Sequence, residues 1–191
     1  MRYLPLAAIA LITAPAFVAP ALAAPAPSWT VDKARSQVAF VASMSGQAIN
    51  GSFKRFDARI AFDPANLAGS SVTAVIDTAS AATGDTSRDQ SLPTPDWFNV
   101  AAFPRAIFAS KSFKSLGGNR YQAAGTLTIR GVARPVVLPF QLVTNGSVAQ
   151  MRGTLTIDRR WFGVGQGQFA SPDSVAAAVK VNIAITARKN A

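Results

Sequence analysis

Apolar and polar residues alternate with a period of two over much of the chain. Within residues 56–63, Phe56, Ile60 and Phe62 fall on one side of an extended backbone, and the charged residues fall on the other. This alternation is typical of a β-strand with one buried face. The same pattern recurs in residues 38–44, 72–76, 121–129, 136–142, 151–157 and 179–186. We therefore predict a series of half-buried strands.

Turn-forming residues separate these runs. They lie at positions 63–66, 117–119, 131–135, 145–146 and 171–173. Asn145-Gly146 fits a two-residue hairpin, because both central positions of such a turn favour positive φ. Gly163, Gly165 and Gly167 predict a bulge or tight bend in a barrel strand. Short strands joined mostly by tight turns indicate an antiparallel sandwich or a closed barrel.

Residues 83–104 break the alternation. The stretch holds three prolines and the aromatic pair Trp97-Phe98. Within it, residues 86–91 predict a short helix, and Asp85 is the expected N-cap. A connection of this length in a compact domain is usually functional or forms a lid. We expect it to cover one end of the fold.

The composition leaves little catalytic chemistry. The 191 residues include 19 Lys and Arg against nine acidic residues, all of them Asp, and there is no His, Cys or Glu. These absences exclude thiol nucleophiles, disulfides, Cys/His zinc sites and Ser-His-Asp triads. We predict a binding protein that is not an enzyme and has no cofactor and no metal. A hydrolase that uses Asp85, Asp89 and Asp96 is the remaining catalytic alternative.

The first 23 residues have the pattern of a cleavable signal peptide. Arg2 precedes an apolar run over residues 4–18, and Ala21-Leu22-Ala23 matches a small-x-small cleavage pattern. The run is shorter than the roughly 20 residues that span a bilayer, and prolines interrupt it. We predict cleavage after Ala23 and export of the domain 24–191, most simply to a bacterial periplasm.

The exported domain is basic. Arg2 is the one charged residue among residues 1–23, so its removal lowers the net charge from +10 to +9. The basic residues are scattered, with no run longer than Lys54-Arg55 or Arg159-Arg160, and nucleic-acid binding is not predicted. We interpret the charge as a solvated basic surface. The alternative is weak contact with an anionic membrane surface, where each nearby basic group contributes about 1 kcal/mol.

A set of motifs follows in order along the chain. They are Trp29-Thr30-Val31-Asp32, Gly51-Ser52-Phe53, Thr83-Gly84, Arg88-Asp89, Trp97-Phe98, residues 125–132, and Arg159 with Phe162-Gly163. In this order and spacing the chain resembles the YceI-like family of exported polyisoprenoid-binding proteins over nearly its whole exported length. The resemblance implies an all-β fold, a lipocalin-like antiparallel β-barrel of about eight strands with a short helical connection.

The resemblance also implies a lipid inside the barrel. Ala58, Ala74 and Ala123 are small residues on inner faces and leave room there. The apolar candidates for ligand contact are Phe40, Phe56, Ile60, Ile76, Trp97, Phe98, Phe108, Leu127, Ile129, Leu138 and Phe162. For each of them, core packing is the alternative role. Arg88 and Asp89 are candidates for head-group contact, or else they tie the connection down.

Two hypotheses of different class result. The leading one is periplasmic binding, storage or transport of an amphiphilic polyisoprenoid lipid or isoprenoid quinone, because an apolar tail cannot cross water unshielded. The alternative is a periplasmic stress-related interaction or inhibitor protein with no lipid ligand. The expected partners are the lipid or quinone and a weakly contacted membrane surface. The sequence is compatible with a monomer and with a dimer.

Overall fold

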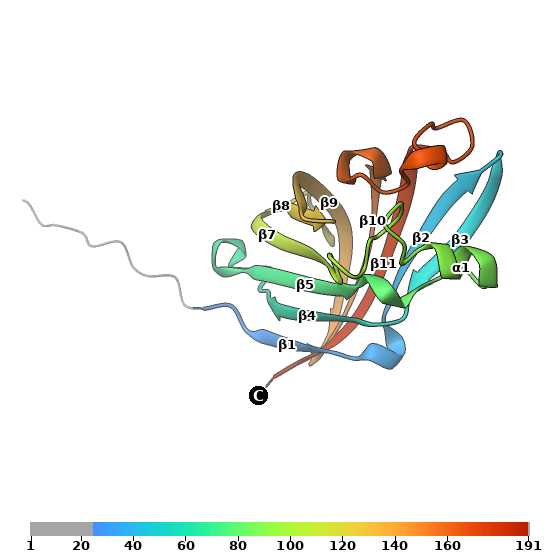
Figure 1. The fold of residues 1–191 in the computed structure, drawn as a ribbon. Coiled ribbons are helices and arrows are strands. Elements are labelled where there is room, and N and C mark those ends of the chain that lie inside the picture. Colours follow the sequence, from blue (N-terminus) through green and yellow to red (C-terminus); the bar gives the residue numbers. More distant parts are fainter. Residues whose placement is uncertain (1–24, 191) are drawn as a thin grey trace, which may run out of the picture.

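Eight antiparallel strands close on themselves to form a barrel in the computed structural model, which describes residues 25–190 (Figure 1). In order around the ring they are β1 (Ser28–Val31), β4 (Phe56–Ala61), β5 (Ser71–Asp77), β7 (Arg105–Ser115), β8 (Arg120–Ile129), β9 (Val132–Asn145), β10 (Val148–Asp158) and β11 (Ala178–Lys189). The predicted antiparallel β-barrel is thereby confirmed. The predicted signal peptide and its cleavage site lie outside the described residues.

The strand β11 closes the ring. One edge of β11 pairs with β10 over residues 178–188. The opposite edge is shared: residues 180–184 pair with β2 (Gln37–Met44), and residues 187–189 pair with β1. At the split, the Thr186 N–H donates to Ser36 Oγ at 3.0 Å and the Ser36 hydroxyl donates to Thr186 O at 3.2 Å. Side-chain hydrogen bonds therefore satisfy the backbone where the ladder changes partner.

A second, smaller layer branches off at this split. The strand β2 pairs with β3 (Gln47–Phe53), and β3 pairs with β6 (Ala81–Ala82). Figure 1 shows the β2–β3 hairpin extending past one end of the barrel, with α1 (Thr86–Ser91) beside it. Short 3-10 helices make the remaining corners: η1 (Lys33–Arg35), η2 (Leu67–Gly69), η3 (Thr78–Ser80), η4 (Arg159–Phe162) and η5 (Gly167–Phe169). The hairpin and α1 thus build a compartment next to the barrel.

Local sequence rules account for α1 and for one hairpin with a small correction. The helix α1 occupies the predicted residues 86–91, and Asp85 Oδ1 accepts from the Arg88 N–H at 2.9 Å, as a cap should. The β9–β10 hairpin is present, but its two loop residues are 146–147, because Asn145 still pairs with Val148. Gly146 has φ of 57°, and Asn145 has no positive φ. A turn with glycine at its first central position explains the shift by one residue.

The strand β7 was not predicted from the alternation. Its register with β8 shifts between Ser110 and Ser112, which marks a β-bulge. Because the bulge inserts one residue, the inward aromatic residues Phe108 and Phe113 are five positions apart. An odd spacing breaks the period-two pattern. The strand β7 is therefore identified only from its pairing in the structure, and not from the sequence pattern.

A buried arginine organises the loop between β10 and β11. Arg159 is 3% exposed. Its guanidinium donates to six backbone carbonyl oxygens, those of Val164, Gly165, Phe169, Ser171, Val175 and Ala176, at 2.6–3.2 Å. Burial lowers the pKa of the Arg159 side chain, and the nearby Asp158 opposes that shift. The loop is therefore folded around one cation, and it also contributes Phe162 and Val164 to the hydrophobic core.

The three alternating glycines lie in this loop and not in a barrel strand, so their predicted location was wrong. All three do make bends, since Gly163, Gly165 and Gly167 have positive φ. A Cβ at Gly165 would lie 2.3 Å from Nη1 of Arg159. Glycine is required there because the backbone closes around the guanidinium.

We predict that Arg159→Met lowers the free energy of unfolding by at least about 3 kcal/mol, because six carbonyl oxygens lose their donor. Arg160→Met is the matched control. Arg160 is half-exposed and pairs with Asp158 at 2.6 Å, so its loss should cost less than about 1 kcal/mol. Urea denaturation of both variants measures the difference. Equal, small losses would show that the loop does not depend on Arg159.

We also predict that stability is flat between about pH 5 and 8 and falls below about pH 4. No side chain of the chain has an ordinary pKa between 5 and 8. A hydrogen bond from Arg35 lowers the pKa of Asp32, and one from Arg160 lowers the pKa of Asp158. A pKa lowered on folding adds stability above the unfolded value, and that stability disappears as the pH falls through the folded value. Melting temperatures recorded across this range test the profile.

The variant Asp32→Asn tests the predicted loss of stability at low pH. This variant should lose less stability than the unmodified protein between about pH 5 and pH 3, since the titrating group is gone. A midpoint of pH denaturation near neutrality would contradict the prediction.

Candidate ligand-binding cavity

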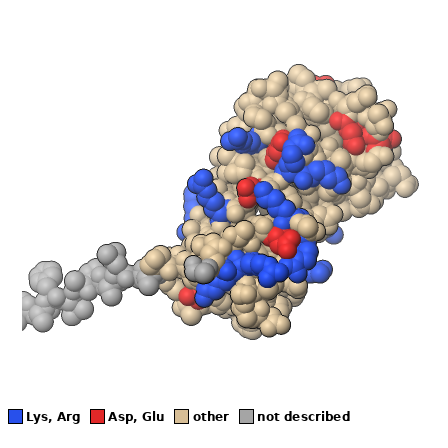
Figure 2. All heavy atoms as spheres, turned by 90° about the horizontal axis from the view of Figure 1, so that it is seen from below, with Lys and Arg blue, Asp and Glu red and all other residues tan. Residues whose placement is uncertain are grey.

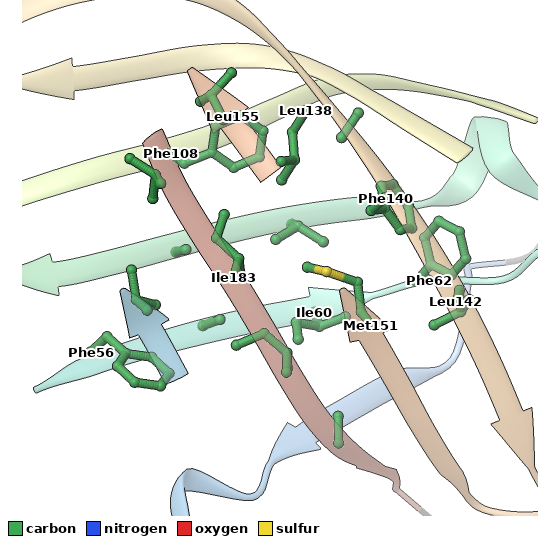
Figure 3. A pocket seen from close by; sticks show the side chains of 18 of the residues that line it. Phe56, Ile60, Phe62, Phe108, Leu138, Phe140, Leu142, Met151, Leu155 and Ile183 are labelled. Atoms are coloured by element: carbon green, nitrogen blue, oxygen red, sulfur yellow. The ribbon is translucent and has the colours of Figure 1, made fainter. Parts of the chain in front are cut away.

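The barrel encloses an apolar cavity of about 210 Å³, here called the lumen chamber. Figure 3 shows labelled side chains such as Phe56, Phe108 and Ile183 gathered around it from different strands. Its lining consists of Trp29, Val38, Phe53, Phe56, Ala58, Ile60, Phe62, Pro64, Val72, Ala74, Ile76, Phe108, Phe113, Ala123, Leu127, Ile129, Leu138, Phe140, Leu142, Thr144, Ala149, Met151, Leu155, Ile157, Val181, Ile183, Ile185 and Ala187. The Trp29 indole N–H is already bonded to Phe62 O at 2.9 Å.

The period-two alternation is what builds this lining. In β8 every second residue is buried from Tyr121 to Ile129, and Leu127 and Ile129 reach the chamber. In β11 the inward residues Val181, Ile183 and Ile185 do the same. The apolar faces therefore converge because the sheet curves into a ring. Space remains where the inward residues are small.

Two alanines make the clearest gap in the wall. Ala58 of β4 lies directly opposite Ala74 of β5 in the ladder, and both line the lumen chamber. In a core cluster elsewhere in the barrel, Phe62, Tyr121 and Phe140 pack edge to face or stacked, with ring centroids 5.6–6.0 Å apart. Large rings thus fill one part of the interior, and small side chains leave another part open.

A second cavity of about 360 Å³, here called the cap chamber, adjoins the first. Its lining comes from the β2–β3 hairpin, α1 and the segments on either side of it, the loop after β10, and residues of β8, β10 and β11. The lining residues are Phe40, Ala42, Met44, Ile49, Phe53, Thr83, Ser87, Arg88, Ser91, Leu92, Trp97, Phe98, Ile129, Ile157, Arg159, Phe162, Val164, Phe169, Val175, Val179 and Val181. Four lining residues, Phe53, Ile129, Ile157 and Val181, are common to both chambers. Together the chambers reach the size range of ligand pockets, about 300–1,000 Å³.

The structure brings all eleven apolar candidates to these cavities. Phe56, Ile60, Ile76, Phe108, Leu127 and Leu138 line the lumen chamber, Phe40, Trp97, Phe98 and Phe162 line the cap chamber, and Ile129 lines both. Several also belong to the packed core around Ala106 and Phe162. Their contact with a ligand stays a prediction.

The two charged candidates, Arg88 and Asp89, make different contacts. Asp89 lines neither chamber, and its Oδ1 accepts hydrogen bonds from the N–H and the hydroxyl of Thr83, both at 2.7 Å. These bonds hold the pKa of Asp89 below its ordinary value. Arg88 lines the cap chamber, donates through Nε to Thr83 Oγ1 at 3.2 Å, and has Nη1 3.7 Å from Asp85. Asp89 therefore ties the connection down, whereas Arg88 forms part of the wall of the cap chamber.

Sequence reasoning missed Phe53, Phe113 and Arg159 as lining residues. The strand β3 carries inward residues at 49, 51 and 53, but the middle one is Gly51, so the hydrophobic pattern is interrupted. A Cβ at Gly51 would lie 2.1 Å from the Phe40 ring, which covers the glycine across the ladder. Reading Gly51 as an apolar position would have revealed the strand.

The surface charge is spread out. Figure 2 shows more basic than acidic side chains on the face seen from below, where several acidic ones touch basic ones and a further acidic group lies apart at the upper right. The ion pairs recorded within residues 25–190, such as Lys33–Asp57 at 3.4 Å and Arg55–Asp77 at 2.8 Å, join largely exposed groups. Such pairs each contribute about 1 kcal/mol or less. This distribution is that of a solvated surface.

Other kinds of site find little support in residues 25–190. No cluster of three His, Cys, Asp or Glu side chains there could hold a metal ion. Over the same residues, no helix is long and apolar enough to cross a bilayer. Asp85 and Asp89, two of the three carboxylates of the hydrolase alternative, are engaged in separate hydrogen bonds within the connection.

Comparison with known proteins matches residues 29–187 to the YceI-like domain. Protein YceI of Escherichia coli O6:H1 is 40% identical over 96 residues, which are 50% of this chain and only half the length of that relative. The crystal structure of BcnA from Burkholderia cenocepacia is similar with a TM-score of 0.79 and 35% identity, over 82% of this chain and 98% of that one. A polyisoprenoid binding domain from Saccharophagus degradans shares the fold, with a TM-score of 0.68 and 15% identity over 86% of this chain and 99% of that domain.

The matched residues begin in β1 and end in β11, the two strands whose pairing closes the barrel. They include the β2–β3 hairpin, α1 and every other strand of the ring. The chain belongs to the YceI-like family.

Proposed function

We propose that this protein binds an amphiphilic polyisoprenoid lipid or an isoprenoid quinone in its barrel, and stores or transports it in the periplasm. The observation that carries the proposal is the lumen chamber, whose lining is hydrocarbon apart from single groups such as Thr144. The similarity in fold to a polyisoprenoid binding domain and the membership in the YceI-like family support it. The inferred activity is binding without catalysis.

An apolar tail gains most from such a site. Each methylene moved out of water contributes about 0.8 kcal/mol, so a chain of many isoprene units is strongly held once enclosed. The 12 residues of β11 rise about 3.3 Å each, so the ring is tall enough for a long tail to lie along it. A hydrocarbon wall offers no directed contacts to a tail. Shape and length are therefore the properties that it selects.

Transport through the periplasm requires export and a place to load. Cleavage after Ala23 would release the barrel domain 24–191 into that compartment. The proposal holds equally for a monomer and for a dimer. A periplasmic interaction or inhibitor protein without lipid is the competing function, and it predicts an empty barrel and a bound protein partner.

Contact with a membrane surface fits the end of the molecule that bears the cap chamber. Trp161 of η4 is 52% exposed, whereas its neighbour Phe162 lines that chamber. Arg160 is half-exposed beside it, and Arg134 donates through Nε to Trp161 O at 3.3 Å. An exposed tryptophan flanked by basic groups is the arrangement that favours an anionic bilayer surface. We infer that this face approaches the membrane during loading.

We predict that the exported protein, purified gently from a bacterial host, carries one lipid adduct. Native mass spectrometry followed by solvent extraction should show masses that differ by isoprene increments. Ala74→Phe should abolish the adduct without loss of melting temperature, because the new ring fills the gap opposite Ala58. Thr73→Phe is the matched control, since Thr73 is exposed on the outer face of the same strand and should leave the adduct intact.

Two outcomes would reject the carrier proposal. One is purified protein without lipid that also fails to take up added polyprenyl lipid. The other is an adduct that survives Ala74→Phe and disappears in Thr73→Phe. Recovery of a stoichiometric protein partner on an empty barrel would favour the interaction protein instead.

We predict further that the protein sediments with vesicles that contain phosphatidylglycerol and not with neutral phosphatidylcholine vesicles. Trp161→Ala should weaken this association by about three- to tenfold, and about 0.5 M salt should do the same by screening. Val143→Ala is the control. Val143 is equally exposed at 56% but lies near the β9–β10 hairpin, away from the cap chamber. Equal effects of the two substitutions would contradict the proposal that the face bearing Trp161 contacts the membrane.

A further inference from the structure

The cap chamber differs chemically from the lumen chamber. Its wall includes six residues with polar groups, Thr83, Ser87, Arg88, Ser91, Trp97 and Arg159. Both charged residues among them are arginines, and no carboxylate lines either chamber. Two of the three hydroxyl groups donate within the connection, since Thr83 donates to Asp89 and Ser91 donates to Ser87 O. The wall is therefore mostly apolar, and the donors that it leaves available are the indole N–H of Trp97 and the guanidinium of Arg88.

One donor in this wall is buried without a partner. Among residues 25–190, the indole Nε1 of Trp97 is the one buried side-chain nitrogen or oxygen that makes no hydrogen bond. Buried polar groups in proteins are almost always paired, because an unmade hydrogen bond costs its desolvation. The ring of Phe169 packs against Trp97 with centroids 5.0 Å apart but supplies no oxygen. The exception is located in the wall of a cavity.

The backbone of Trp97 is held from several sides. Its N–H donates to Thr94 O at 3.0 Å, and its carbonyl oxygen accepts from Nη1 of Arg130. The neighbouring Phe98 N–H donates to Leu92 O at 2.9 Å. With the backbone anchored and one face against Phe169, the indole has little freedom to seek a protein acceptor. An acceptor must come from the chamber side.

The charges around the chamber favour an electron-rich group. Arg159 donates to carbonyl oxygens and to no carboxylate, so its positive charge is offset only by the more distant Asp158. Arg88 is 3.7 Å from Asp85, longer than the 2.7–2.9 Å of a charge-assisted hydrogen bond. Neither cation is neutralised at contact distance by the chamber wall. A ligand group with oxygen acceptors and no hydrogen-bond donor suits both the unpaired indole N–H and the two cations.

We propose that the cap chamber receives the polar head of the bound amphiphile, that this head presents an oxygen acceptor to Trp97 Nε1 and Arg88, and that the tail extends into the lumen chamber. The inference rests on the proposed function and adds the orientation and the head-group class. A quinone carbonyl and a prenyl phosphate share the required chemistry. The four residues common to both chambers are apolar, so a polar head stops at them.

The test compares ligands with and without oxygen on delipidated full-length exported protein. The probes are squalene, which is an isoprenoid hydrocarbon, a short-chain ubiquinone analogue, and farnesyl phosphate, with affinity measured by isothermal titration calorimetry. Trp97→Phe keeps the packing against Phe169 and removes the N–H. We expect it to raise the Kd of the better-binding oxygenated probe by about three- to tenfold and to change the Kd of squalene by less than about twofold.

Two variants complete the design. Trp29→Phe removes an indole N–H that is bonded to Phe62 O in the lumen chamber, so it should change the affinities for all probes by one common factor. Arg88→Met identifies the source of the acceptor. A loss of more than about tenfold for farnesyl phosphate with a small loss for the quinone supports a phosphate head, and losses of similar, small size support a carbonyl.

A wild-type measurement protects the test from a variant that fails to fold. The indole ¹⁵N–¹H resonance of Trp97 should move downfield on addition of the oxygenated probe and stay in place with squalene. Equal effects of Trp97→Phe on squalene and on the oxygenated probes, or an indole resonance that never moves, would overturn the orientation. If no probe binds the wild-type protein, the proposed function itself fails, and that result is distinct from the other two.

Discussion

Backbone pairing along both edges of β11 determines the shape of the molecule. One edge is fully paired with β10, whereas the other is divided between β2 and β1. Closure through β1 leaves the ring without a free edge, which removes the exposed hydrogen-bonding groups that an open sheet presents. The division at Thr186 lets β2 leave the ring and pair with β3. Both chambers follow from this arrangement, because the ring encloses one and the diverging hairpin borders the other.

The interior is shaped by where large and small residues meet across the ladder. Ala58 faces Ala74 and leaves space, while Phe40 covers Gly51 and fills it. At the cap end, a single buried cation holds the loop in place beside its packed apolar residues, because Arg159 donates to the carbonyl oxygens of its own loop. Such a loop can be polar in its backbone and still border an apolar cavity. This is how a barrel with a hydrocarbon lumen acquires a second compartment at one end, in which Trp97 and Arg88 leave donors available.

The division of polarity matches an amphiphile better than a plain hydrocarbon. The lumen chamber is lined by Phe56, Leu138 and similar side chains, which exclude water and favour a longer apolar tail. The cap chamber adds Arg88 and the unpaired indole of Trp97. The proposed orientation follows from this difference, with the polar end of the ligand in the cap chamber. The exposed Trp161 is next to Phe162 in η4, so the surface proposed to approach the membrane lies beside the cap chamber.

Local rules were enough to predict most of the strands, the α1 helix with its Asp85 cap, and most of the inward apolar candidates, because alternation and capping depend only on neighbours in sequence. They could not reveal β7, whose bulge breaks the period, or β3, whose inward Gly51 is covered by a ring from another strand. They also could not identify the role of Arg159, since its partners are scattered over residues 164–176 and become neighbours only when the loop closes. The sequence by itself determined which faces are apolar. The tertiary structure decided which faces enclose a cavity and which donors are left unpaired there, since these properties depend on contacts between distant segments.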